Sequence, residues 1–123
     1  MHGVILWILF ILLALPSLGA KAPAPGIAIP NKDRASLNQE TNALKAKIDS
    51  LGNHSLLPDV IIFHNAVRYA LDDDMFYKKE DVKSAHKLLK LGHERADQLK
   101  KGKHPWITAT GLVVRGYRST IDD

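Results

Sequence analysis

The sequence has 123 residues, a formal net charge of +4 at pH 7 and no cysteine. The length is that of one small domain, and the lack of cysteine excludes both disulfide bonds and a lipid anchor attached through cysteine. The positive charge is concentrated in residues 78–103, which hold nine basic and four acidic residues. A basic helix can bind nucleic acid, but a solvated helix face gives the same pattern, and we expect no nucleic-acid partner.

Residues 1–20 have the layout of a secretory signal peptide. The apolar run 4–15 is followed by residues 16–20, most of them small, and we predict cleavage after Ala20. The run is shorter than the ~20 residues that span a bilayer. We therefore predict an exported, periplasmic or extracellular protein that meets the membrane only through this signal sequence. An uncleaved N-terminal anchor is the alternative.

Residues 21–32 are predicted to be a proline-rich linker, because prolines at this density prevent a helix. A helical segment, 33–104, follows, and we expect three antiparallel helices in it, at 36–51, 58–71 and 79–101. Ser36 and Gln39 fit a capping box at the beginning of the first helix. Pro58 suits the first position of the second helix.

The third predicted helix carries an apolar seam with the period of a coiled coil. The steps between its residues alternate between three and four, and several members are small, which favours close approach of another helix. This seam is the first candidate interaction surface, with Val82, Ala85, Leu89, Gly92, Ala96 and Leu99 as its residues.

Residues 105–123 are predicted to begin a β-rich domain. The stretch 110–123 is rich in strand-forming residues and predicts a strand or hairpin. A lone strand leaves its backbone unpaired, so we expect its partner to lie outside these residues. Trp106 and Tyr117 could line a binding site but are more often core residues; both are kept as candidate interaction residues. The predicted fold class is thus mainly α, with a C-terminal β-element.

Catalytic, cofactor and metal sites are not expected. His86 and His93 lie seven residues apart on one helix, about 10.5 Å along its axis, which is too far for one zinc ion. Asp72, Asp73 and Asp74 lack the pattern of a calcium loop. The G-x-S-x-G signature of a serine hydrolase is absent.

Several stretches carry a resemblance to a known family. Residues 103–106 and 110–122, with the sequence G-L-V-V-R-G-Y-R-S at their centre, resemble the N-terminal region of secreted bacterial prolyl-oligopeptidase-like hydrolases. Upstream, Leu57-Pro58-Asp59-Val60, Ala66-Val67, Ala70-Leu71 and Phe76 resemble the helical lead-in of the same proteins. The resemblance implies a β-rich region and an α/β-hydrolase domain after this chain, with the catalytic serine, acid and histidine in that later domain.

Two functions follow as hypotheses. The first is an exported, non-catalytic N-terminal segment of a serine-hydrolase-like protein, which packs against and positions the β and α/β-hydrolase domains that are missing here. The second is a small secreted helical module that binds a protein partner through its third helix or its terminal strand.

Overall fold

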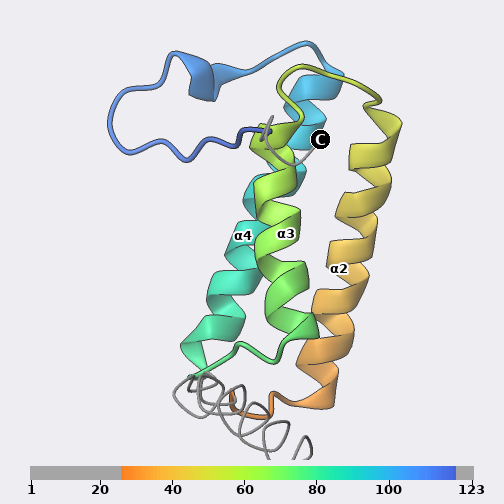
Figure 1. Cartoon of the computed structure of the whole chain (residues 1–123), viewed down its shortest axis with the longest axis vertical. Coiled ribbons are helices and arrows are strands. Elements are labelled where there is room, and N and C mark those ends of the chain that lie inside the picture. The colour runs from red at the N-terminus through yellow and green to blue at the C-terminus, as the bar shows by residue number, and fades with distance from the viewer. Residues whose placement is uncertain (1–25, 119–123) are drawn as a thin grey trace, which may run out of the picture.

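The computed structural model describes residues 26–118, and the predicted signal peptide lies outside them. Three helices form the body of the molecule: α2 (Asn31–Ser50), α3 (Pro58–Asp72) and α4 (Glu80–Lys100). They run up, down and up beside one another, and each packs against the other two (Figure 1). A short 3-10 helix, η1 (Pro105–Ile107), follows α4. The predicted mainly-α class with three packed helices is confirmed.

Helix α2 begins earlier than predicted. It starts at Asn31 directly after Pro30, whose carbonyl accepts the backbone N–H of Arg34 at 3.0 Å. The predicted capping box is wrong, because Ser36 lies inside the helix and its hydroxyl donates to Glu40 at 3.4 Å. A proline provides the fixed backbone angle that suits entry into a helix, so the boundary required no capping hydroxyl. Helices α3 and α4 lie within one residue of their predicted ends.

The core is a continuous apolar cluster between the three helices. It is built from residues at helical spacing on each element, as expected for faces that are buried against neighbours. Its fully or almost fully buried side chains include Leu37, Leu44, Val60, Phe63, Val67, Leu71, Ala85, Leu89, Ala96 and Leu99.

Gly92 marks the closest approach of α4 to its neighbours. A Cβ atom at this position would lie 2.8 Å from Leu44 Cδ2 and 2.9 Å from Phe63 Cβ. Glycine in a helix interior costs about 1 kcal/mol relative to alanine. The close packing of α2 and α3 over this residue offsets that cost.

The chain that leads into α2 is anchored on the bundle. Ile27 donates its backbone N–H to the carbonyl of Phe76 at 2.6 Å, and Ile29 is buried in the core. Residues 31 and 32 already belong to α2. The C-terminal end of the predicted linker is therefore packed against the helices rather than extended in solvent. Its prolines prevent a helix but do not prevent the apolar side chain of Ile29 from being buried.

The strand predicted for 110–123 is not found in residues 26–118, which contain no strand at all. After η1 the chain forms an open loop that leaves the helices and returns to the beginning of α3 (Figure 1). The physical reason is that a strand requires a second strand to pair its backbone, and the described residues provide none. Instead, the segment 113–118 is held by the side chain described next.

Candidate functional site

Asp59, in the first turn of α3, is the centre of the candidate site. Its side chain is only 2% exposed, although it carries a carboxylate. Three donors reach it from beyond α4. Oδ2 accepts from Trp106 Nε1 at 2.8 Å and from Arg115 Nε at 2.9 Å, and Oδ1 accepts from the backbone N–H of Gly116 at 2.7 Å. These donors lie 47, 56 and 57 residues away in the sequence, so Asp59 ties the end of the described chain to its middle.

The carboxylate of Asp59 is held in its charged form. Burial alone raises the pKa, because a charge is poorly solvated inside a protein. The hydrogen bonds from Trp106 and Gly116, together with the charge and hydrogen bond of Arg115, outweigh this effect and lower the pKa below its ordinary value of 3.8. Hydrogen bonds to an ionised acceptor are about twice as strong as those between neutral groups.

Arg95, from α4, braces the same site. Its guanidinium lies 4.9 Å from the ring centroid of Phe63 and 4.9 Å from that of Trp106. Nη1 also donates to the backbone carbonyl of Asp59 at 3.0 Å. The pKa of Arg95 is lowered from its ordinary value. Burial is the largest cause and the positive charge of Arg115 acts in the same direction, whereas the Asp59 carboxylate opposes the shift. The planar guanidinium thus fixes the Trp106 indole in the position from which its N–H meets Asp59.

Gly116 brings the backbone of the terminal segment directly onto α3. A Cβ at Gly116 would lie 2.1 Å from the carbonyl oxygen of Pro58 and 2.8 Å from Ile62 Cγ2. No side chain fits at these distances. The glycine is therefore required for the segment to lie against the first turn of α3 and to donate its N–H to Asp59.

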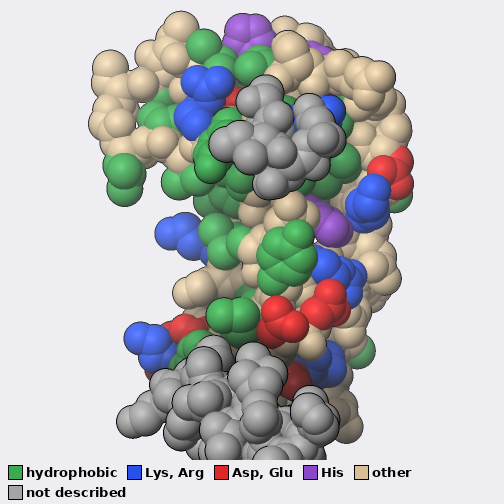
Figure 2. Space-filling view, viewed as in Figure 1, with side chains coloured by type: hydrophobic (Ala, Val, Ile, Leu, Met, Phe, Trp, Pro, Cys, Tyr) green, Lys and Arg blue, Asp and Glu red, His purple; other side chains and the backbone are tan. Residues whose placement is uncertain are grey.

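Exposure along the segment before Gly116 does not alternate strictly, because the Arg115 side chain is 49% exposed although it reaches Asp59. Val113 is half-buried against the core and Arg115 reaches Asp59. Leu112 is 100% exposed and Val114 is 53% exposed. Hydrophobic side chains are visible on the surface of this loop and beside the beginning of α3 (Figure 2).

The residues predicted to interact with a partner are distributed differently from expectation. In the α4 seam, Val82 is half-buried and the other five residues are buried against α2 and α3. The seam therefore packs inside this chain. Trp106 is buried in the Asp59 site, as the core interpretation holds, whereas Tyr117 is 87% exposed. The structure does not bring these two aromatic side chains together in one site.

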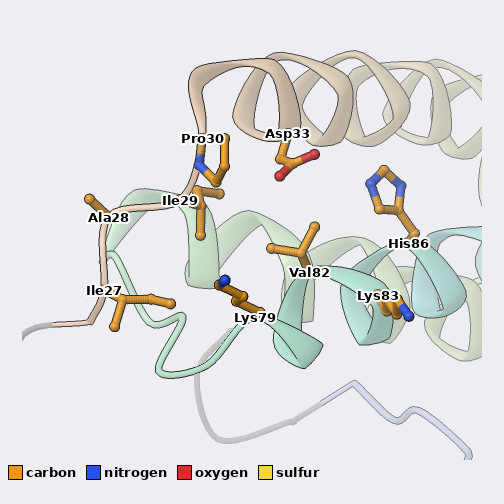
Figure 3. Close-up of a pocket in the computed structure, with 9 residues that line it drawn as sticks. All are labelled: Ile27, Ala28, Ile29, Pro30, Asp33, Lys79, Val82, Lys83 and His86. Carbon is orange, nitrogen blue, oxygen red and sulfur yellow. The ribbon is translucent and has the colours of Figure 1, made fainter.

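A second concave site lies at the end of the bundle where α2 and α4 begin (Figure 3). It has a volume of about 600 Å³. Ile29 and Val82 provide apolar walls, and Asp33, Lys79 and His86 provide charged or polar groups at its edge. No hydroxyl or thiol is among the described residues that line it. His86 Nδ1 lies 3.0 Å from Glu40 Oε1, so this histidine already has a carboxylate partner.

Within residues 26–118, no group of three or more His, Cys, Asp or Glu side chains is arranged to hold a metal ion. The same residues include no helix whose length and hydropathy would allow it to cross a membrane.

Sequence reasoning missed the residues that build the Asp59 site. Asp59, Arg95, Arg115 and Gly116 were not among the candidate interaction residues, and only Trp106 was. One signal was present: Asp59 is a single carboxylate within the otherwise apolar window 56–63. A buried charge is rare unless it is paired, so this pattern indicates distant donors.

Comparison with known proteins provides no family for this chain. No family model, no curated protein and no solved structure matches it.

Proposed function

We propose that this chain is the exported, non-catalytic N-terminal module of a serine hydrolase of the prolyl-oligopeptidase-like kind, and that it packs against and positions the domains that follow. The observation that carries the proposal is the anchoring of the outgoing chain at Asp59. Its three hydrogen bonds fix Trp106, Arg115 and Gly116 on the first turn of α3.

Fixing the outgoing segment at Asp59 costs conformational entropy. Because the chain contains hydrogen bonds that offset this cost, the fixed position supports a positioning role. Ordering each backbone residue costs about 1–2 kcal/mol. A flexible tether between domains requires no such ordering, and it requires no buried carboxylate. Hydrogen bonds to a charged group contribute about 1.5–3 kcal/mol each and offset the cost here. An outgoing segment with a fixed place and direction is what a following domain needs if it is to dock on the helices.

The family resemblance supports the same proposal from the sequence. Two of the parts that carry the resemblance, 57–60 and the group 103–106 with 110–122, are far apart in the chain, but their described residues meet at the Asp59 site. Asp59 belongs to the first stretch, and Trp106, Arg115 and Gly116 belong to the second. Residues from both parts of the resemblance thus contact one another at the Asp59 site.

The first test is the reading frame beyond codon 123. We expect it to continue for several hundred codons and to encode a G-x-S-x-G nucleophile motif. In the full protein, Asp59→Ala should lower hydrolysis of a small ester substrate and speed proteolysis within 105–118. Asp49→Ala, at an exposed site on α2, is the matched control. A frame without a hydrolase domain, or full ester hydrolysis in Asp59→Ala, would contradict the proposal.

A small secreted binding module is the second candidate. The exposed Leu112 and Tyr117 favour its terminal-segment form. Its other form, pairing through the α4 seam, would require the bundle to open, because five of the six seam residues are buried. A stop codon directly after codon 123 would favour this second function.

A further inference from the structure

We infer that the concave site at the beginnings of α2 and α4 binds a zwitterion with an apolar side chain, either a free amino acid or a short peptide. The site has a volume of about 600 Å³, which is within the range of about 300–1,000 Å³ that is usual for small-molecule sites. It lies at the opposite end of the bundle from Asp59, because α3 runs antiparallel to α2 and α4 (Figure 1). The inference therefore goes beyond the proposed function and does not depend on it.

Two side chains of opposite charge face the site from different helices. Asp33 lies in the first turn of α2, and Lys79 is the residue directly before α4. Figure 3 shows the Asp33 carboxylate on the side of α2, facing Val82 across the site, and the Lys79 ammonium close to Ile29. The site thus presents a negative group on one wall and a positive group on another.

Neither of these charges is neutralised within the described part of the chain. The ion pairs among residues 26–118 include neither Asp33 nor Lys79, so the two side chains also do not pair with each other. Asp33 is only partly exposed, and water therefore solvates its carboxylate incompletely. A zwitterion with its ammonium at Asp33 and its carboxylate at Lys79 pairs with both groups through charge-assisted hydrogen bonds, which are stronger than neutral ones.

The other polar groups of the site agree with this orientation of the ligand. Lys83 lies one turn after Lys79 on α4, so it adds positive charge on the side where the carboxylate of the ligand would lie. His86 Nδ1 lies 3.0 Å from Glu40 Oε1, so His86 is already paired. Asp33 is the only carboxylate among the described residues that line the site, and the ammonium of the ligand is therefore assigned to it.

The walls between the two charges are apolar. Ile29 is buried, Val82 is half-buried and Ile27 is 42% exposed, and all three line the site. An aliphatic side chain that lies against them is removed from water, which favours binding. Opposite charges on either side of aliphatic walls suit an apolar amino acid better than a purely charged or a purely apolar compound.

Other small molecules fit the same groups less well. An anionic amphiphile such as a fatty acid would pair with the lysines, but its apolar tail would cover the Asp33 carboxylate without giving it a donor, which is unfavourable. An organic cation would pair with Asp33 but would be repelled by Lys79 and Lys83. Only a compound that carries both charges has a partner for each group.

Titration of the 123-residue chain with L-leucine, followed by the amide chemical shifts in NMR spectra, tests the inference. We expect saturable shifts in residues 27–33 and 79–86, and none in the first turn of α3. Leucinamide lacks the carboxylate and N-acetyl-leucine lacks the ammonium, so each should bind at least about tenfold more weakly. Free glycine, which has no apolar side chain, should also bind at least about tenfold more weakly than leucine.

Two variants assign each charge of the ligand to a residue. Asp33→Asn should weaken the binding of leucine about tenfold and leave that of N-acetyl-leucine unchanged, because this probe has no ammonium. Lys79→Gln should weaken the binding of leucine about tenfold and leave that of leucinamide unchanged, because that probe has no carboxylate. Asp49→Asn and Lys87→Gln, at exposed positions of the same two helices outside the site, are the controls and should not change the binding of leucine.

The dipeptide leucyl-leucine distinguishes the two sources of the zwitterion. Tighter binding of the dipeptide than of leucine would assign the site to short peptides, and weaker binding would assign it to free amino acids. Octanoate that binds more tightly than both would overturn the inference, because the site would then hold an anionic amphiphile. The absence of saturable shifts in residues 27–33 and 79–86 with every probe would also overturn it.

These outcomes are separate from the test of the positioning function. A site without affinity for any of the probes leaves the anchoring at Asp59 unchanged, because the two sites lie at opposite ends of the bundle (Figure 1). Conversely, full ester hydrolysis in Asp59→Ala, with leucine still bound at Asp33 and Lys79, would contradict the positioning function alone.

Discussion

The indole Nε1 of Trp106 lies 2.8 Å from Oδ2 of Asp59, in a site where both residues are buried. Each residue satisfies the hydrogen-bonding requirement of the other. A buried indole N–H requires an acceptor, and a buried carboxylate requires donors. Because the two residues are 47 positions apart, their bond closes a loop that contains most of α3 and all of α4.

Asp59→Ala should lower the free energy of unfolding by about 2–4 kcal/mol, because it leaves the buried Trp106 N–H and the half-buried Gly116 N–H without an acceptor and removes the partner of Arg115. Urea denaturation of the 123-residue chain, followed by circular dichroism at 222 nm, measures this change. Asp49→Ala removes an exposed carboxylate paired with Lys45 and should cost less than about 0.5 kcal/mol. Similar losses in the two variants would show that the Asp59 hydrogen bonds contribute little.

The stability of the chain should depend on the charge of Asp59 at acidic pH. The pKa of Asp59 is lower in the folded chain than its ordinary value of 3.8. Its contribution is therefore fully present above pH 3.8 and is lost as the pH falls through the lower, folded pKa. We expect the difference in unfolding free energy between the natural chain and Asp59→Asn to be constant near neutral pH and to shrink below about pH 4.

Urea titrations at several pH values between about 7 and about 2.5 measure this difference across the range in which the carboxylate titrates. Comparison with Asp59→Asn at each pH is necessary because the other carboxylates of the chain also titrate in this range. A difference that stays constant down to the lowest pH would mean that the negative charge of Asp59 does not stabilise the folded chain.

The three helices could be predicted because their signals are local. Pro58 opens α3 directly, and the alternation of three and four residues between Val82 and Leu99 follows the buried face of α4. The beginning of α2 was missed because Ser36 and Gln39 match a capping pattern that the helix did not use. The capping pattern involves only two residues, and Pro30, six residues before Ser36, provides an equally good beginning for the helix.

The Asp59 site could not be predicted in the same way. An aspartate in the first turn of a helix is ordinary, because it favours the positive end of the helix dipole. What makes Asp59 unusual is its burial under donors that arrive from residues 106, 115 and 116, and such long-range contacts leave no periodic pattern. The strand propensity of 110–118 was recognised, but propensity alone cannot say whether a partner strand is present.

Gly92→Ala should destabilise the chain although alanine is the better helix former. The propensity gain is about 1 kcal/mol. It is outweighed by overpacking, which typically costs about 1–3 kcal/mol, because the new Cβ would meet Leu44 and Phe63 at under 3.0 Å. Thermal unfolding by circular dichroism should therefore give a lower Tm for the variant.

A second background separates overpacking from other effects of Gly92→Ala. In Leu44→Ala the nearest clashing atom, Leu44 Cδ2, is gone, so Gly92→Ala should cost less there than in the natural chain. Equal costs in the two backgrounds would exclude Leu44 as the source of the strain. A gain in Tm in the natural chain would contradict close approach of α4 and α2 at this point.

Arg95→Lys should loosen the terminal segment even though it keeps the positive charge. A lysine has no planar group to lie between the rings of Phe63 and Trp106, and it cannot reproduce the guanidinium geometry that also reaches the Asp59 carbonyl. We expect the unfolding free energy to fall by about 1–2 kcal/mol, because the cation–π interactions and the hydrogen bond of the guanidinium are removed. Lys90→Arg, at an exposed position of the same helix, is the control and should change little.

Hydrogen exchange then locates the effect of Arg95→Lys within the chain. The Gly116 amide should exchange faster while the amides of α2 keep their rates, because the guanidinium of Arg95 is the group that holds Trp106 in place over Asp59. Uniform acceleration over all three helices would instead mean that Arg95 stabilises the whole bundle rather than the anchoring of residues 106–116.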